Sequence, residues 1–220
     1  MLRRTFLVCG ALSSLLYVVG DVLAGVFYPQ YHSYRSQMVS ELMATGAPTR
    51  SLMVWLFIPY NLLVFAFAGG VWRSAEERRA TRLTAMVLVG YGVLSSAGLM
   101  LTPMDMRGTG PLPAPTILHI WDTVVQGIFI MLALVFGAFV HGSRFRLYSF
   151  ATLFLCLAFG AWAGAQATQQ STPWLGLTER VNIYAWMLWI AVLAVSLLHA
   201  RHSSATPVVG QQRRGPQPAL

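Results

Sequence analysis

The sequence predicts an all-α polytopic membrane protein, a bundle of six transmembrane helices. Of its 220 residues, 56% are hydrophobic and only 10% are charged, which is not the composition of a soluble domain. The apolar residues gather in runs of about 19 to 24 residues, each long enough to cross about 30 Å of hydrocarbon. The six predicted spans are 5–27, 51–71, 82–102, 117–140, 145–166 and 181–199.

The first span follows Met1-Leu-Arg-Arg and could be mistaken for a signal peptide. Its apolar run exceeds the 7 to 15 residues of a usual signal core, and no Ala-x-Ala lies near its end. We therefore expect an uncleaved span. It carries Asp21, and Ser14 and Tyr17 fall on the same helical face.

The second and third spans are joined by a short charged turn. In span two, Pro59 removes a backbone hydrogen bond inside the helix, so we expect an opening near mid-membrane. Asn61 would lie beside that opening.

The fourth span carries the strongest functional signal. His119, Asp122 and Gln126 are spaced at i, i+3 and i+7, which places them on one helical face. A carboxylate in hydrocarbon costs about 3 kcal/mol or more, so Asp122 should face protein or water and have a partner.

Spans five and six complete the predicted domain, 1–202. Span five contains Gly160 and Gly164 in a pattern that permits close helix packing, and Glu179 and Arg180 precede span six. Residues 203–220 are rich in Gln, Pro, Gly and Arg, and we expect a disordered cytoplasmic tail.

The arginines predict the orientation in the membrane. Eleven lie before span one, after span six or in the connections after spans two and four, and four lie on the other side. The positive-inside rule then places both termini in the cytoplasm, and we expect a multi-pass protein of the cytoplasmic (inner) membrane. Because the charges are spread over short loops, we do not expect nucleic-acid binding.

The acidic residues predict a polar pocket near the extracytoplasmic face. Only Glu76 and Glu77 lie on the inner side of the predicted topology. We take His119, Asp122 and Asp105 as candidate catalytic residues. The candidate binding residues are Asp21, Glu41, Asn61, Gln126 and His32.

Three chemistries fit such a pocket. His119, Asp122 and Asp105 could hold a metal ion, since catalytic sites use three nitrogen or oxygen ligands and a water, but the sequence specifies no cofactor. The same residues could act as general acid and base, although no nucleophile motif accompanies them. Asp21 and Asp122 could also relay protons or cations. The simplest alternative is that these groups only brace the helices.

Several short segments resemble the DUF998 family of uncharacterised bacterial integral membrane proteins. They are 36–42 (Ser-Gln-Met-Val-Ser-Glu-Leu), 46–50 (Gly-Ala-Pro-Thr-Arg), 59–61 (Pro-Tyr-Asn) and 103–105 (Pro-Met-Asp), followed by His119. The family often has Glu-Leu-Gly where this chain has Glu41-Leu-Met43. The resemblance implies a six-helix membrane protein with its motif residues on the outer side, and it implies no particular activity.

These observations predict an integral membrane protein to which no particular activity can be assigned from the sequence. We expect a membrane enzyme or a binding protein for a lipid or small amphiphile, with the bilayer as its surroundings. A small transporter or proton-coupled permease and a structural accessory subunit remain the alternatives. The sequence does not decide whether the protein is an enzyme, nor its oligomeric state.

Overall fold

Six long helices make up the part of the protein that the structure describes, as predicted from the sequence. The computed structural model describes residues 1–28, 33–106, 111–167 and 172–200, so His32 and the expected tail lie outside the described residues. All six helices are long and apolar enough to cross a membrane. The elements are α1 (Leu2–Phe27), η1 (Ser40–Met43), α2 (Arg50–Trp72), α3 (Arg79–Leu101), α4 (Ala114–Gly137), α5 (Ser143–Ala167) and α6 (Leu175–His199).

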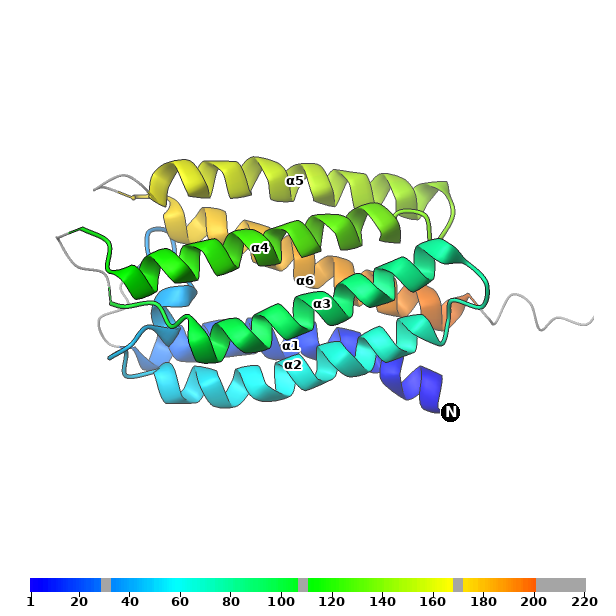
Figure 1. Ribbon diagram of the computed structural model, residues 1–220, viewed down its shortest axis with the longest axis horizontal. Helices are drawn as coiled ribbons and strands as arrows, with labels where there is room; N and C mark the ends of the chain where they lie inside the picture. Colours follow the sequence, from blue (N-terminus) through cyan, green and yellow to red (C-terminus); the bar gives the residue numbers. More distant parts are fainter. Residues whose placement is uncertain (29–32, 107–110, 168–171, 201–220) are drawn as a thin grey trace, which may run out of the picture.

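The helices form an up-and-down ring (Figure 1). Each packs on its neighbour in the chain, and α6 closes the ring against α1. We call the end that holds residues 33–49, 102–106, 111–113 and 172–174 the cap end. The opposite end, with the N-terminus, the end of α6 and the turns 73–78 and 138–142, is the terminal end.

Two helices differ from their predicted course. Span two was expected to open at Pro59, but α2 continues through this proline from Arg50 to Trp72. Span six was expected to begin at residue 181, but α6 begins at Leu175 and includes Glu179 and Arg180. Arg180 can lie inside the helix because its charge is paired, as described below.

Aromatic side chains fill the centre of the ring. Trp186 and Trp189 of α6 stack with their ring centroids 5.3 Å apart. The Trp189 Nε1–H donates to the Ser149 hydroxyl of α5 at 3.0 Å, and the hydroxyls of Tyr60 and Tyr91 share a hydrogen bond of 2.9 Å between α2 and α3. Without a hydrophobic drive between helices in lipid, such contacts fix their positions.

The seam between α4 and α5 is closed at one end only. At the terminal end, Phe139 and Phe150 are in edge contact at 6.2 Å, and the Arg146 guanidinium lies 5.1 Å from the Phe139 ring. Toward the cap end the two helices separate (Figure 1), and no α4 residue from 117 to 132 is buried. This stretch of α4 carries the polar residues that the sequence analysis identified, His119, Asp122 and Gln126.

Candidate functional site

A buried ion pair joins α1 to α6 at the cap end. The Asp21 carboxylate is completely buried, and the Arg180 guanidinium donates to both of its oxygens at 2.9 Å, through Nε to Oδ2 and Nη2 to Oδ1. The Tyr184 hydroxyl adds a third donor to Oδ2 at 2.5 Å. A bidentate pair with a further hydrogen bond satisfies a buried carboxylate well.

Arg180 also fastens the first connection over the helix ends. Its Nη1 donates to the carbonyl oxygens of Tyr34 and Gln37 at 2.9 and 2.8 Å. Next to it, the backbone N–H of Val39 donates to the Glu179 carboxylate at 2.5 Å. The segment 33–39 is thereby held on α6 by charged side chains.

Glu41 belongs to the same connection, residues 33–49, which we call the cap. It is buried in η1, and its Oε1 accepts a hydrogen bond from the backbone N–H of Met38 at 3.1 Å. Burial raises the pKa of Tyr28, and the nearby negative charge of Glu41 raises that pKa further. Glu41 is therefore bonded within the cap and lies close to Tyr28 at the end of α1.

The polar face of α4 lies along α3. Near its start, the Thr116 hydroxyl accepts a hydrogen bond from the backbone N–H of Asp105 at 3.1 Å. One turn later, His119 Nδ1 meets the carbonyl of Thr102 at 2.9 Å. The Gln126 amide then donates to Asp122 Oδ2 at 2.7 Å. His119, Asp122 and Gln126 thus line one seam, which we call the α3–α4 seam.

Gly98 of α3 allows the two helices to approach at this seam. A Cβ atom placed on Gly98 would overlap the Asp122 carboxylate and lie 3.2 Å from the Gln126 amide nitrogen. Small residues permit such close packing in membranes. The Asp122 carboxylate therefore rests on the α3 backbone.

Among the residues that the structure describes, two side-chain atoms of the α3–α4 seam receive no hydrogen bond. Because the Thr102 carbonyl can only accept, His119 Nδ1 donates to it, and this tautomer of an uncharged imidazole would leave a lone pair on Nε2. Within the described residues, Asp122 receives one hydrogen bond, from Gln126, and its Oδ1 receives none. Both side chains are half-buried and lie about one turn apart.

The structure divides the predicted site residues instead of gathering all of them. Asp21 and Glu41 lie at the cap, whereas His119, Asp122 and Gln126 line the α3–α4 seam, and Asp105 lies in the connection between these two helices. Among the residues that the structure describes, no hydrogen bond or ion pair joins Asp21 to Asp122. An isolated parallel β-bridge between Thr45 and Asp105 connects the cap to the segment between α3 and α4.

Asn61 lies apart from both groups. It is 4% exposed within α2, and its Oδ1 has no hydrogen-bond partner in the described part of the chain. Because α2 is continuous at Pro59, the expected backbone opening beside Asn61 is not formed.

The hypothetical metal-ligand set is not assembled. In residues 1–28, 33–106, 111–167 and 172–200, no group of three or more His, Cys, Asp or Glu side chains could hold a metal ion. His119 Nδ1 is engaged by a backbone carbonyl, and Asp122 by an amide. His119 and Asp122 therefore lie on the seam and Asp105 lies in the connection before α4, so the three side chains do not converge on a point.

Sequence reasoning missed Arg180 and Tyr184. Arg180 was counted only as a loop charge that reports topology, although Asp21 required a partner. A cation beside the start of span six was the available signal, but Arg50 stands in the same position before span two. Nothing in the sequence distinguishes these two candidates.

The chain was also compared with known proteins. It matches, over residues 11–196, the family described as "Protein of unknown function (DUF998)". No curated protein and no solved structure matches it.

Proposed function

The chain belongs to the DUF998 family, whose description assigns no function, and we propose that this protein binds a lipid or small amphiphile at the α3–α4 seam. The observation that carries the proposal is the Asp122 carboxylate, which receives one neutral donor within a membrane-spanning helix. It lies about 12 Å along α4 from Ala114, at 1.5 Å per residue.

A carboxylate at this depth favours a ligand that donates hydrogen bonds. Charged side chains inside membranes pair with one another or mark substrate pathways, because an unpaired charge is costly in hydrocarbon. Asp122 Oδ1 and His119 Nε2 are both acceptors. An ammonium or polyhydroxylated head group would supply the missing donors to both.

Access from the bilayer favours an amphiphile over a soluble ligand. α4 buries no side chain between residues 117 and 132, and Trp121 is 64% exposed. A Cβ atom on Gly127 of α4 or Gly164 of α5 would meet nothing within 4 Å. A lipid chain could therefore lie along α4 while its head group reaches Asp122.

His119 extends the proposal toward catalysis. Its Nε2 lone pair could accept a proton from a bound head group, as a general base does. The reaction class stays open because no nucleophile accompanies it. A transport path finds less support, because the sequence of α4 from Gly127 to Gly137 contains only apolar residues and glycine.

A binding experiment with model amphiphiles tests the proposal. Thermal unfolding of the purified protein in a neutral detergent would be followed with added dodecylamine, dodecyl glucoside or dodecanoate. Dodecylamine should stabilise the protein most and dodecanoate not at all. Asp122→Asn should weaken dodecylamine binding by about 10- to 100-fold, since hydrogen bonds to charged groups contribute about 1.5 to 3 kcal/mol.

Asp105→Asn is the matched control, because it removes a carboxylate at the same end whose side chain makes no hydrogen bond in the described part of the protein. This variant should bind dodecylamine like the wild type. Equal stabilisation by dodecanoate, or unchanged binding in Asp122→Asn, would contradict the proposal. A variant that only unfolds more easily would indicate that the seam braces the helices.

A further inference from the structure

A second candidate site lies at the terminal end, opposite the α3–α4 seam. An open groove of about 510 Å³ runs between the start of α5 and the end of α6. Its volume falls within the range of about 300 to 1,000 Å³ that is usual for ligand sites. Its lining residues are His141, Gly142, Ser143, Arg144, Phe145, Ser196, His199 and Ala200.

The lining is suited to an anion. It contains one arginine, two histidines and two serines, and no acidic residue. It also includes the first turn of α5, where backbone N–H groups lack helical acceptors and the helix dipole is positive. Donors and positive charge therefore approach the groove from the start of α5, through Arg144 and the backbone N–H groups of the first turn.

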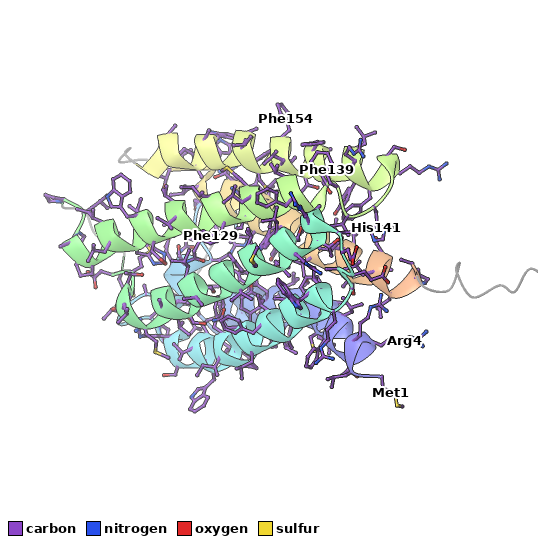
Figure 2. All side chains as sticks on the ribbon, turned by 45° about the vertical axis from the view of Figure 1, so that its right-hand side comes forward. Met1, Arg4, Phe129, Phe139, His141 and Phe154 are labelled. Carbon is purple, nitrogen blue, oxygen red and sulfur yellow. The ribbon has the colours of Figure 1, made fainter. Side chains whose placement is uncertain are left out.

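His141 supplies an independent sign of a missing partner. Its Nε2 atom is buried and has no hydrogen-bond partner among the described residues, although it belongs to a side chain that lines the groove. Figure 2 shows His141 at the terminal end of the bundle, and the neighbouring Arg78 donates to the adjacent Val140 carbonyl at 3.5 Å. The groove is thus bordered by a histidine whose buried ring nitrogen has no partner among the described residues, and the positive charge of Arg78 lies close to this histidine.

The position of the groove in the membrane identifies the source of the anion. It lies where α5 begins and α6 ends, which is the level at which membrane-spanning segments meet the head groups of the lipids. Basic pockets between transmembrane helices at that level suit anionic head groups. We propose that this groove binds the phosphate group of an anionic phospholipid through Arg144, His141 and the first turn of α5.

Lipid retention by variants of the full chain tests this inference. Native mass spectrometry would count the dioleoylphosphatidylglycerol molecules that remain on protein released from nanodiscs, with dioleoylphosphatidylcholine for comparison. The wild type should retain one anionic lipid in preference to the zwitterionic one. Arg144→Gln should weaken this retention about fivefold, the contribution of one arginine at an anionic surface, and His141→Gln should also weaken it.

Arg146→Gln is the matched control. It removes the same charge two residues further along α5, but the Arg146 guanidinium lies over Phe139 and does not line the groove. This variant should retain lipid like the wild type. Both Arg144 and Arg146 are exposed, so neither substitution should prevent folding.

Two results would overturn the inference. Equal lipid loss in Arg144→Gln and Arg146→Gln would show that only general surface charge attracts the lipid. Stabilisation of the detergent-solubilised protein by inorganic phosphate, without selective retention of phosphatidylglycerol, would assign the groove to a soluble anion.

Discussion

Asp21 and Asp122 are chemically identical groups that lie in the cap-end halves of membrane-spanning helices, yet their surroundings differ. Asp21 is fully buried and accepts three hydrogen bonds, two of them from a guanidinium. Asp122 is half-buried and, within the described part of the chain, accepts one hydrogen bond, from the amide of Gln126 on its own helix.

The difference separates a structural carboxylate from a candidate functional one. A buried charge that is fully paired contributes to a fixed arrangement of helices, and Arg180 extends that arrangement to the first connection through the Tyr34 and Gln37 carbonyls. A carboxylate with spare acceptor capacity has a reason to bind something else. Placing a carboxylate in the membrane costs free energy at both positions. Among the described residues, only Asp21 has a cation that compensates this cost.

The largest effect is expected from breaking the satisfied pair. Arg180→Gln leaves the buried Asp21 without its counter-charge, which should lower the free energy of unfolding by about 3 to 5 kcal/mol. Reversible unfolding in mixed detergent micelles would measure it. Arg35→Gln removes an exposed arginine that lies 4.6 Å above the Trp174 ring, and it should cost less than about 1 kcal/mol. Equal decreases in the free energy of unfolding for the two variants would show that the Asp21–Arg180 ion pair stabilises the protein no more than an exposed arginine does.

A smaller effect is expected from disturbing how the cap lies on α6. A Cβ atom on Gly176 would overlap the carbonyl oxygen of Gln37, so Gly176→Ala should lower the free energy of unfolding by about 1 to 3 kcal/mol. Gly164→Ala offers the control, because a Cβ there meets nothing within 4 Å. The same unfolding assay should find the control within about 0.5 kcal/mol of the wild type.

The unsatisfied carboxylate should respond differently from the satisfied one. Asp122→Asn keeps a group of the same shape and removes a charge from the membrane, so its free energy of unfolding should change by less than about 1 kcal/mol. A loss as large as that of Arg180→Gln would place Asp122 among the structural groups. Measuring both variants under identical detergent conditions would decide between these outcomes.

The smallest effect concerns His141 at the terminal end, whose Nε2 atom has no hydrogen-bond partner among the described residues. Burial lowers the pKa of His141, and the positive charge of Arg78 lowers it further. The unfolded chain then takes up the proton first. Protonation of His141 therefore does not reduce the free energy of unfolding above a pH of about 6.5, and reduces it progressively as the pH falls below that value. His141→Gln should reduce this acid-induced decrease in unfolding temperature. An unchanged pH profile would show that His141 does not cause it.

Most of the fold could be predicted because hydrocarbon imposes a simple rule on sequence. Backbone groups in the membrane must bond within their own segment, so a long apolar run has few alternatives to a helix. The errors occurred where a local signal suggested an interruption. Pro59 was tolerated within α2, and the charges of Glu179 and Arg180 lie inside α6 instead of before it.

The candidate site was less predictable because helical spacing gives a face but not its partner. The spacing of His119, Asp122 and Gln126 indicated a common face, and α3 lies against that face. It could not indicate that Asp21 would meet Arg180, 159 residues away in the chain. The predicted orientation in the membrane stays a prediction.

The sequence by itself determined that this chain is a six-helix membrane protein, because the length and apolarity of each run are local properties. Only the tertiary structure decided which polar groups are paired, since that depends on how the ring closes and brings α6 beside α1. The same closure gave Asp21 a cation and left Asp122 with an amide. The sequence alone shows that a carboxylate lies within an apolar run and costs free energy there. The cation that offsets this cost can come from a residue that is distant in sequence, as Arg180 does for Asp21.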